Sequence, residues 1–208
     1  MTIFNWEAFL RRWSKEVLES HDYDSFPPEV HITGWLGYPS ATDEEIAAAE
    51  RRLNTRLPPS YRAFLKVSNG WRQTTPFVHR IWPTDGIEWF AQRHSNWIEA
   101  FIRRYGDRGQ DLSSIDLSTD LAYWVYGEEQ DCRSLRSHYL YSALEVSQKG
   151  DGSIYLLNPQ VTTDTGEWEA WFFGDWLPGA DRYRSFEALM RAEYDNFREL
   201  RDINRERL

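Results

Sequence analysis

The sequence predicts a single α+β domain, in which a mainly antiparallel sheet of about four to six strands is flanked by helices. Apolar residues recur at helical spacing in the first half and near the C-terminal end, with capping residues at the boundaries. Between these regions, residues 121–173 hold aromatic and branched runs separated by turn residues, which is typical of strands. A chain of 208 residues, 41% of them hydrophobic, is long enough for one sizeable core.

The domain is expected to span residues 1–208, with residues 1–40 as a helical lead-in. Residues 5–19 predict an amphipathic helix whose N-cap is Asn5. Its polar face mixes acidic and basic residues, so we expect it to pack on the domain rather than on a membrane surface. Residues 20–40 contain three prolines and two glycines, and they predict an irregular segment.

Residues 41–71 predict two short helices with clear boundaries. Thr42 and Glu45 have the spacing of a capping box at the start of the first helix. Asn54 is expected to end that helix in the left-handed conformation, and Pro59 suits the first turn of the next one. Their inner faces are expected to hold Ile46, Ala49, Leu53, Tyr61, Phe64, Leu65 and Ser68.

Residues 77–82 predict an extended piece, and a third helix is expected from Asp85 to Gly106. His94 lies on the apolar face of this helix, where a satisfied, half-buried histidine is the expectation rather than a ligand or a base. Strands are predicted over 121–126, 139–147, 153–157 and 167–173. A hairpin turn is predicted at residues 150–152, and Ser185 is expected to cap a long final helix.

Patterns that carry catalysis or bind metals do not occur in the sequence. The five histidines are scattered, and neither a phosphate loop nor a Gly-x-Ser-x-Gly elbow is present. Cys132 is the only cysteine, so an intramolecular disulfide is excluded, and its acidic neighbours are expected to raise its pKa. Glu167 and Glu169 are expected on one exposed strand face, without the rest of a glycosidase site. We therefore expect no enzyme activity, no catalytic residue, no cofactor and no metal.

Composition also restricts the partners and the compartment. No apolar run is long enough to cross a bilayer, and residues 1–13 lack a secretory pattern, so the expected location is cytoplasmic. The net charge of −9 argues against direct binding of nucleic acid, and no membrane partner is expected.

Acidic residues gather in one stretch, residues 107–131, which we call the acidic segment. It contains seven acidic residues against Arg108 alone. Any single acidic residue here is most simply interpreted as part of a solvated loop face. Together the seven form the best candidate surface for steering a basic partner. They are Asp107, Asp111, Asp116, Asp120, Glu128, Glu129 and Asp131.

The eleven tryptophans are expected to build most of the core, because each can bury a large apolar area. Trp71, Trp82 and Trp176 lie near predicted turns. These three are therefore the candidates for surface exposure and for anchoring an interface.

A set of motif positions lies between residues 35 and 70: Trp35-x-Gly37, Ala41-Thr42-x-x-Glu45-Ile46, Glu50, Leu53, Leu57-Pro58-x-x-Tyr61, Phe64-Leu65 and Asn69-Gly70. Their order resembles the SUKH superfamily, which includes Smi/Knr-type fungal cell-wall regulators and many bacterial immunity proteins. The resemblance weakens through the aromatic middle and returns near Gly150 to Phe186. Members often carry Gly where this chain has Asn54, and the motif contains no catalytic residues.

This resemblance implies a non-catalytic protein-binding domain, first of all a bacterial immunity protein that neutralises a cognate toxin by direct binding. Toxins of such systems are often nucleases, whose basic substrate grooves an acidic protein could fill. The alternative is an intracellular regulatory scaffold like the fungal relatives. An enzyme acting on carbohydrate is the weakest of the three hypotheses. The toxin, the binding surface and the oligomeric state do not follow from the sequence.

Overall fold

The computed structural model describes residues 4–20, 26–105 and 121–206. Its sheet is antiparallel throughout, with the strand order β1-β2-β3-β4-β5, which confirms the predicted α+β class. The strands are β1 (Glu88–Trp89), β2 (Leu144–Glu145), β3 (Ser153–Thr162), β4 (Trp168–Gly174) and β5 (Ala180–Tyr183). The α-helices in the described ranges are α1 (Trp6–Glu19), α2 (Pro28–Thr33), α3 (Asp43–Leu53), α4 (Pro59–Leu65), α5 (Phe90–Tyr105) and α6 (Phe186–Glu206). The described ranges also contain the 3-10 helices η3 (Gly127–Glu129), η4 (Cys132–Ser134) and η5 (Ser137–Tyr141).

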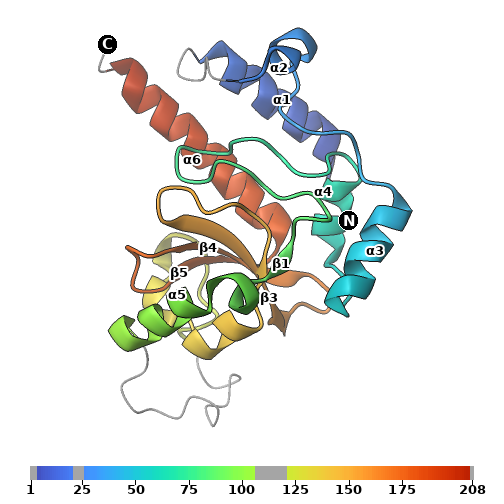
Figure 1. Ribbon diagram of the computed structural model, residues 1–208. Helices are drawn as coiled ribbons and strands as arrows, with labels where there is room; N and C mark the ends of the chain where they lie inside the picture. The colour runs from blue at the N-terminus through green and yellow to red at the C-terminus, as the bar shows by residue number, and fades with distance from the viewer. Residues whose placement is uncertain (1–3, 21–25, 106–120, 207–208) are drawn as a thin grey trace.

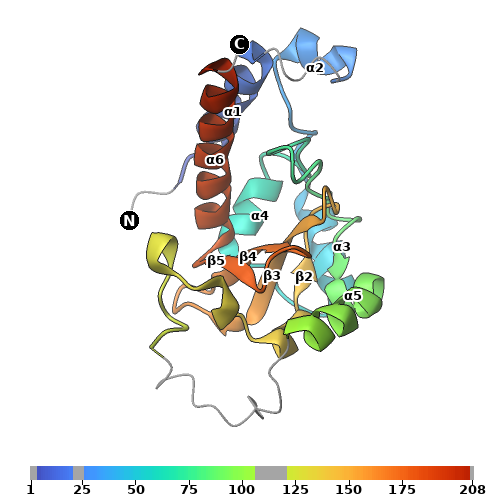
Figure 2. The ribbon, with the colours of Figure 1, turned by 90° about the vertical axis from the view of Figure 1, so that its left-hand side faces the viewer.

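Helices lie on both faces of the sheet (Figures 1 and 2). On one face α4 and α6 pack on the sheet, and α1 packs against α6. On the other face α5 and η5 build a second apolar cluster. Successive residues of β3 therefore enter different clusters: Tyr155 and Leu157 face α6, whereas Ile154 and Leu156 face α5. Within the described ranges, no helix combines the length and the apolar character needed to cross a membrane.

The N-terminal helix is part of the main core. Asn5 caps α1 by accepting a hydrogen bond from the Ala8 N–H at 3.0 Å, as the sequence predicts. Trp6 and Trp13 are buried, and the Trp6 ring stacks on Phe186 of α6 at a centroid distance of 5.8 Å. The apolar face of α1 thus packs on the domain.

The predicted capping box is present at the start of α3. The Glu45 N–H donates to Thr42 Oγ1 at 3.1 Å, and the Thr42 N–H donates to Glu45 Oε2 at 2.7 Å. The helix ends at Asn54, whose φ of 50° is left-handed. Ile46, Ala49 and Leu53 are buried, as predicted.

Replacing Thr42 with Ala is expected to destabilise the domain by about 1 kcal/mol, because the Glu45 N–H loses its acceptor at the end of the helix. Equilibrium denaturation measures the change as a lower midpoint at constant slope. Thr42→Ser keeps the acceptor and is the matched control. An Ala variant as stable as the Ser variant would contradict the capping role.

Several predicted elements differ from the structure. Residues 121–126 form a turn instead of a strand, because Tyr123 is buried against η5 and its hydroxyl is bonded to β4. The helix expected from Asp85 begins at Phe90, since Glu88 and Trp89 pair with β2 as strand β1. The segment predicted to be irregular contains α2, which ends at Gly34 with a left-handed φ of 64°. β5 was not predicted at all.

Candidate protein-binding surface

The described acids of the acidic segment lie on an exposed turn beside β5. Glu128 and Glu129 lie in η3 and Asp131 precedes η4, and all three side chains are exposed. Asp131 Oδ1 also accepts a hydrogen bond from the Arg133 N–H at 3.0 Å, which caps η4. We call these three residues the acidic turn. The other predicted acids, Asp107, Asp111, Asp116 and Asp120, lie outside the described residues.

A buried arginine fixes the acidic turn to the sheet. Arg182 of β5 has no exposed side-chain surface, and its guanidinium donates to the carbonyl oxygens of Tyr123 and Val125. Its backbone N–H donates to Gln130 Oε1 at 2.6 Å. The chain also approaches closely at Gly179, where a Cβ would lie 1.7 Å from the Cys132 carbonyl oxygen. The three acidic side chains are therefore presented by a firmly held backbone.

The partner of Arg182 is Glu169 of β4, which is 1% exposed. Burial, reinforced by this carboxylate, raises the pKa of Tyr123 and Tyr126, so both phenols remain donors. Glu169 accepts hydrogen bonds from Tyr123 Oη at 2.7 Å, Tyr126 Oη at 2.8 Å, Trp171 Nε1 at 2.8 Å, Asn158 Nδ2 at 3.3 Å and Arg182 Nη1 at 3.4 Å. We call this set the Glu169 network.

The prediction that Glu167 and Glu169 share an exposed strand face is wrong. Glu169 is buried because helices and turns cover both faces of β4. Glu167 precedes the strand, and it accepts hydrogen bonds from the backbone N–H and the hydroxyl of Ser60 at 2.8 and 2.6 Å. It therefore caps α4. Burial raises the pKa of this half-buried carboxyl.

The three candidate tryptophans have different environments. Trp176, between β4 and β5, is 53% exposed, and its Nε1 donates to Ser153 Oγ at 3.2 Å. Trp82 is half-buried. The predicted exposure of Trp71 is wrong, because its backbone pairs with Ile81 and its side chain lies fully buried against the rings of Trp13 and Trp35.

The predicted surface residues do not form one site. The acidic turn lies beside β5, whereas Trp82 Nε1 donates to Glu145 Oε1 of β2 at 3.2 Å, near the opposite edge of the sheet. Burial raises the pKa of the Cys132 thiol, and the carboxylates of Asp181 and Asp131 raise it further. Cys132 is therefore a poor nucleophile.

Near Trp82 the structure reveals an alternating stack of guanidinium groups and aromatic rings, which we call the arginine–aromatic stack. Arg72 lies 4.3 Å from the centre of the Tyr38 ring, and Arg80 lies 5.1 Å from the same centre. Arg80 is also 5.6 Å from the Trp82 ring, and Arg93 is 5.5 Å from it. These distances are typical of cation–π contacts.

Glu145 fixes one end of the stack. This carboxylate is 2% exposed, and it accepts a hydrogen bond from Arg93 Nη1 at 2.8 Å. His94 Nε2 lies 3.2 Å from Glu145 Oε2, and the ring is half-buried, as predicted. Burial lowers the pKa of His94, while Glu145 opposes that shift. The backbone of His94 leaves helical geometry at φ −132° and ψ 37°.

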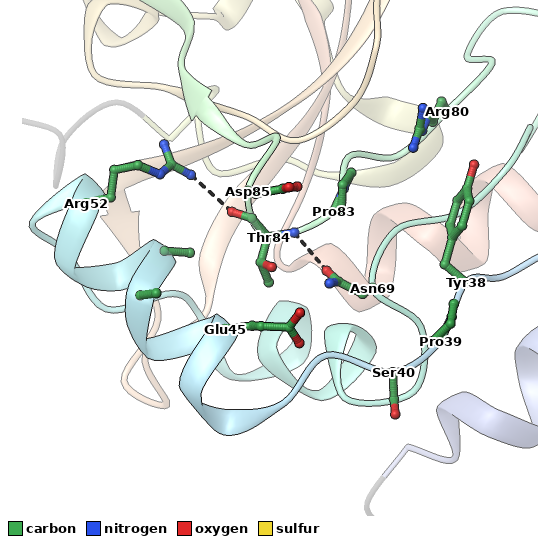
Figure 3. Close-up of a pocket in the computed structure, with 12 residues that line it drawn as sticks. Tyr38, Pro39, Ser40, Glu45, Arg52, Asn69, Arg80, Pro83, Thr84 and Asp85 are labelled. Carbon is green, nitrogen blue, oxygen red and sulfur yellow. Dashed lines mark hydrogen bonds between the residues drawn. The ribbon is translucent and has the colours of Figure 1, made fainter.

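A pocket of about 530 Å³ lies between α3 and the segments that carry Tyr38 and Arg80 (Figure 3). Arg80 and Tyr38 lie together at one side, and Arg52 lies at the other. The Arg52 guanidinium donates to the Thr84 carbonyl oxygen at 3.0 Å, and Asn69 Oδ1 accepts from the Thr84 N–H at 2.7 Å. The pocket wall is thus held by its own hydrogen bonds.

The stack consists of Arg, Tyr and Trp, which are the residues enriched in the energetic centres of protein interfaces. In the described ranges, no three His, Cys, Asp or Glu side chains gather as a metal site. Trp82 is the member of the stack that the sequence predicts as a candidate. Tyr38 and Arg80 carry no such signal, because they are far apart in the chain and share no periodicity.

The chain matches the model of the SMI1 / KNR4 family (SUKH-1) over residues 40–201. No curated protein matches it. The matched residues include α3, Arg80, Trp82 and the acidic turn, and they cover well over half of the chain. The sequence, which resembles the SUKH superfamily in its capping and turn residues, therefore belongs to the SMI1 / KNR4 family (SUKH-1).

Proposed function

We propose that this chain is a non-catalytic protein-binding domain that acts in the cytoplasm as a bacterial immunity protein. It binds a cognate toxin domain directly and blocks the active site of that toxin. Membership of the SMI1 / KNR4 family is the observation that carries this proposal. A regulatory scaffold is the alternative that the same membership allows.

The acidic turn supports a basic partner. Its carboxylates are exposed. Its backbone is already fixed without a partner, by the hydrogen bonds of Arg182 and by close packing against Gly179. A preorganised charge cluster raises the rate of encounter and loses little conformational freedom on binding. Trp176, about half exposed in the connection between β4 and β5, offers the aromatic area that an interface anchor needs.

The test uses the C-terminal domain of the protein encoded by the neighbouring reading frame. Co-expression of this chain should restore growth to cells that produce the active toxin domain, and the two purified proteins should bind when the toxin is catalytically inactivated. Neither protection nor binding would overturn the immunity proposal and favour the scaffold.

Reversing Glu128, Glu129 and Asp131 to Lys is expected to slow association with this toxin domain more than it speeds dissociation. Association of the unmodified chain should also slow as salt rises, because exposed charges are screened within about 10 Å at 0.1 M ionic strength. Binding kinetics at two salt concentrations measure both effects. A matched control reverses Glu99, Asp164 and Glu199, which are exposed acids elsewhere on the surface. Equal slowing in both triple variants would assign the effect to net charge instead of the acidic turn.

A further inference from the structure

We infer that the guanidinium of Arg80 is the receptor for a carboxylate group of a partner protein. The inference names a contact of the protein-binding domain proposed above and rests on that proposal for the class of partner. Arg80 lies at the pocket of Figure 3 and between the rings of Tyr38 and Trp82.

The Arg80 guanidinium lacks hydrogen-bond acceptors within the described ranges. Arg80 is only partly exposed and its Nε is buried, yet no hydrogen bond or ion pair joins its guanidinium to another residue of the described ranges. Its neighbours in the stack differ. Arg72 donates to the Leu36 and Gly37 carbonyl oxygens, and Arg93 donates to Glu145. A partly buried guanidinium without acceptors lacks its normal complement of hydrogen bonds, which points to an absent acceptor.

The backbone and the side chain of Arg80 are both preorganised. The Arg80 carbonyl oxygen accepts a hydrogen bond from the Gln148 N–H at 2.8 Å, and the adjacent Ile81 pairs with both Trp71 and Ser147. The backbone that carries Arg80 is therefore tied to the core on two sides. The rings of Tyr38 and Trp82 restrict the side chain, so a ligand would meet a guanidinium that has already lost much of its freedom.

The shape of the guanidinium and the charge of the chain favour a carboxylate over other anions. The flat guanidinium fork fits a carboxylate through two parallel hydrogen bonds. Glu45, Asp85 and Arg52 line the same pocket, so its lining is not strongly basic, and the whole chain has a net charge of −9. The negative charge of the chain opposes a phosphate dianion or a nucleic acid more strongly than a single carboxylate. The fitting group is an Asp or Glu side chain, or a chain-terminal carboxylate, on the surface of a protein.

The experiment follows the side-chain Nε–Hε signals of arginine by NMR during a titration of the intact chain with sodium acetate at constant ionic strength. We expect a saturable shift of the Arg80 signal and of the Trp82 indole N–H signal in the millimolar range. Arg56, which is exposed, is the internal control and should show only a small linear drift. In Arg80→Gln the saturable response of Trp82 should be lost, whereas Arg56→Gln should retain it.

Two results would overturn the inference. One is an Arg80 signal that responds to acetate no more than Arg56 does. The other is a stronger saturable response to inorganic phosphate than to acetate, which would make the site a phosphate receptor. Because the wild-type signals decide the outcome, a folding defect of Arg80→Gln would not obscure it. The titration needs no toxin, so its failure is separate from a failure of the immunity proposal.

Discussion

Replacing Glu169 with Gln is expected to lower the free energy of unfolding by about 3–5 kcal/mol, because the change leaves the charge of Arg182 buried without an opposite charge. Arg182 has no exposed side-chain surface, and a guanidinium does not lose its proton in a protein. Tyr123, Tyr126 and Trp171 would also donate to a neutral amide oxygen in place of a carboxylate. Denaturant unfolding measures the loss as a lower midpoint.

The neighbouring substitution Glu167→Gln is the matched control, since the chemical change is the same but the side chain is half-buried and bonded to Ser60. It should cost about 1 kcal/mol or less. Glu169→Met combined with Arg182→Met removes both charges and should recover part of the loss. A Glu169→Gln variant within about 1 kcal/mol of the wild type would show that the network does not depend on the ion pair.

The Glu169 network also shows where prediction from the sequence ends. Signals between near neighbours predicted the local structure correctly: Thr42 with Glu45, Asn54 and the Asn5 cap are all observed. Ser185 likewise caps the final helix, accepting a hydrogen bond from the Ala188 N–H at 3.1 Å. These interactions lie within one turn of chain, so their geometry follows from the residue types.

Features set by distant segments were missed. The alternation of side chains along a strand predicted that Glu169 lies on an exposed face. The chain around Tyr123 covers that face and supplies hydrogen-bond donors to the carboxylate. Trp71 follows a turn, yet backbone pairing with Ile81 directs it into the core. The arginine–aromatic stack joins segments around residues 38, 72, 80 and 93, and nothing local marks them as neighbours. Such sites depend on tertiary contacts, which local propensity and periodicity do not encode.

Another buried carboxyl, Glu193 of α6, makes stability depend on pH in the opposite sense to an ordinary ion-paired acid. It is 1% exposed, and it accepts hydrogen bonds from Tyr155 Oη and from Asn196 Nδ2. No ion pair joins it to a cation within the described residues. Burial raises the pKa of Glu193 to about 7, and Asp181 adds to the shift. Tyr155 and Tyr183 face it as neutral phenols, because burial and Glu193 raise their pKa values.

The sign of the effect follows from the two states. The folded chain keeps the proton of Glu193 up to about pH 7, whereas the unfolded chain releases it near the ordinary value of 4.5. The stabilisation from this proton is complete below the pKa of the unfolded chain, 4.5. It is lost as pH rises through the pKa of the folded chain, about 7. Glu193 should therefore lower the free energy of unfolding by about 3 kcal/mol between about pH 4.5 and pH 7.

Glu193→Gln should remove this pH dependence, since the amide cannot ionise and can still accept the hydrogen bond from Tyr155. Relative to the wild type, the variant should gain up to about 3 kcal/mol on going from about pH 5 to about pH 8. Denaturant unfolding at both pH values measures that gain, and Glu199→Gln, an exposed change on the same helix, is the control. The difference between variant and wild type cancels the titration of groups that are not coupled to Glu193, such as Glu167 and His94. If the variant and the wild type differed in free energy of unfolding by the same amount at both pH values, Glu193 would already be ionised in the folded chain at the lower pH.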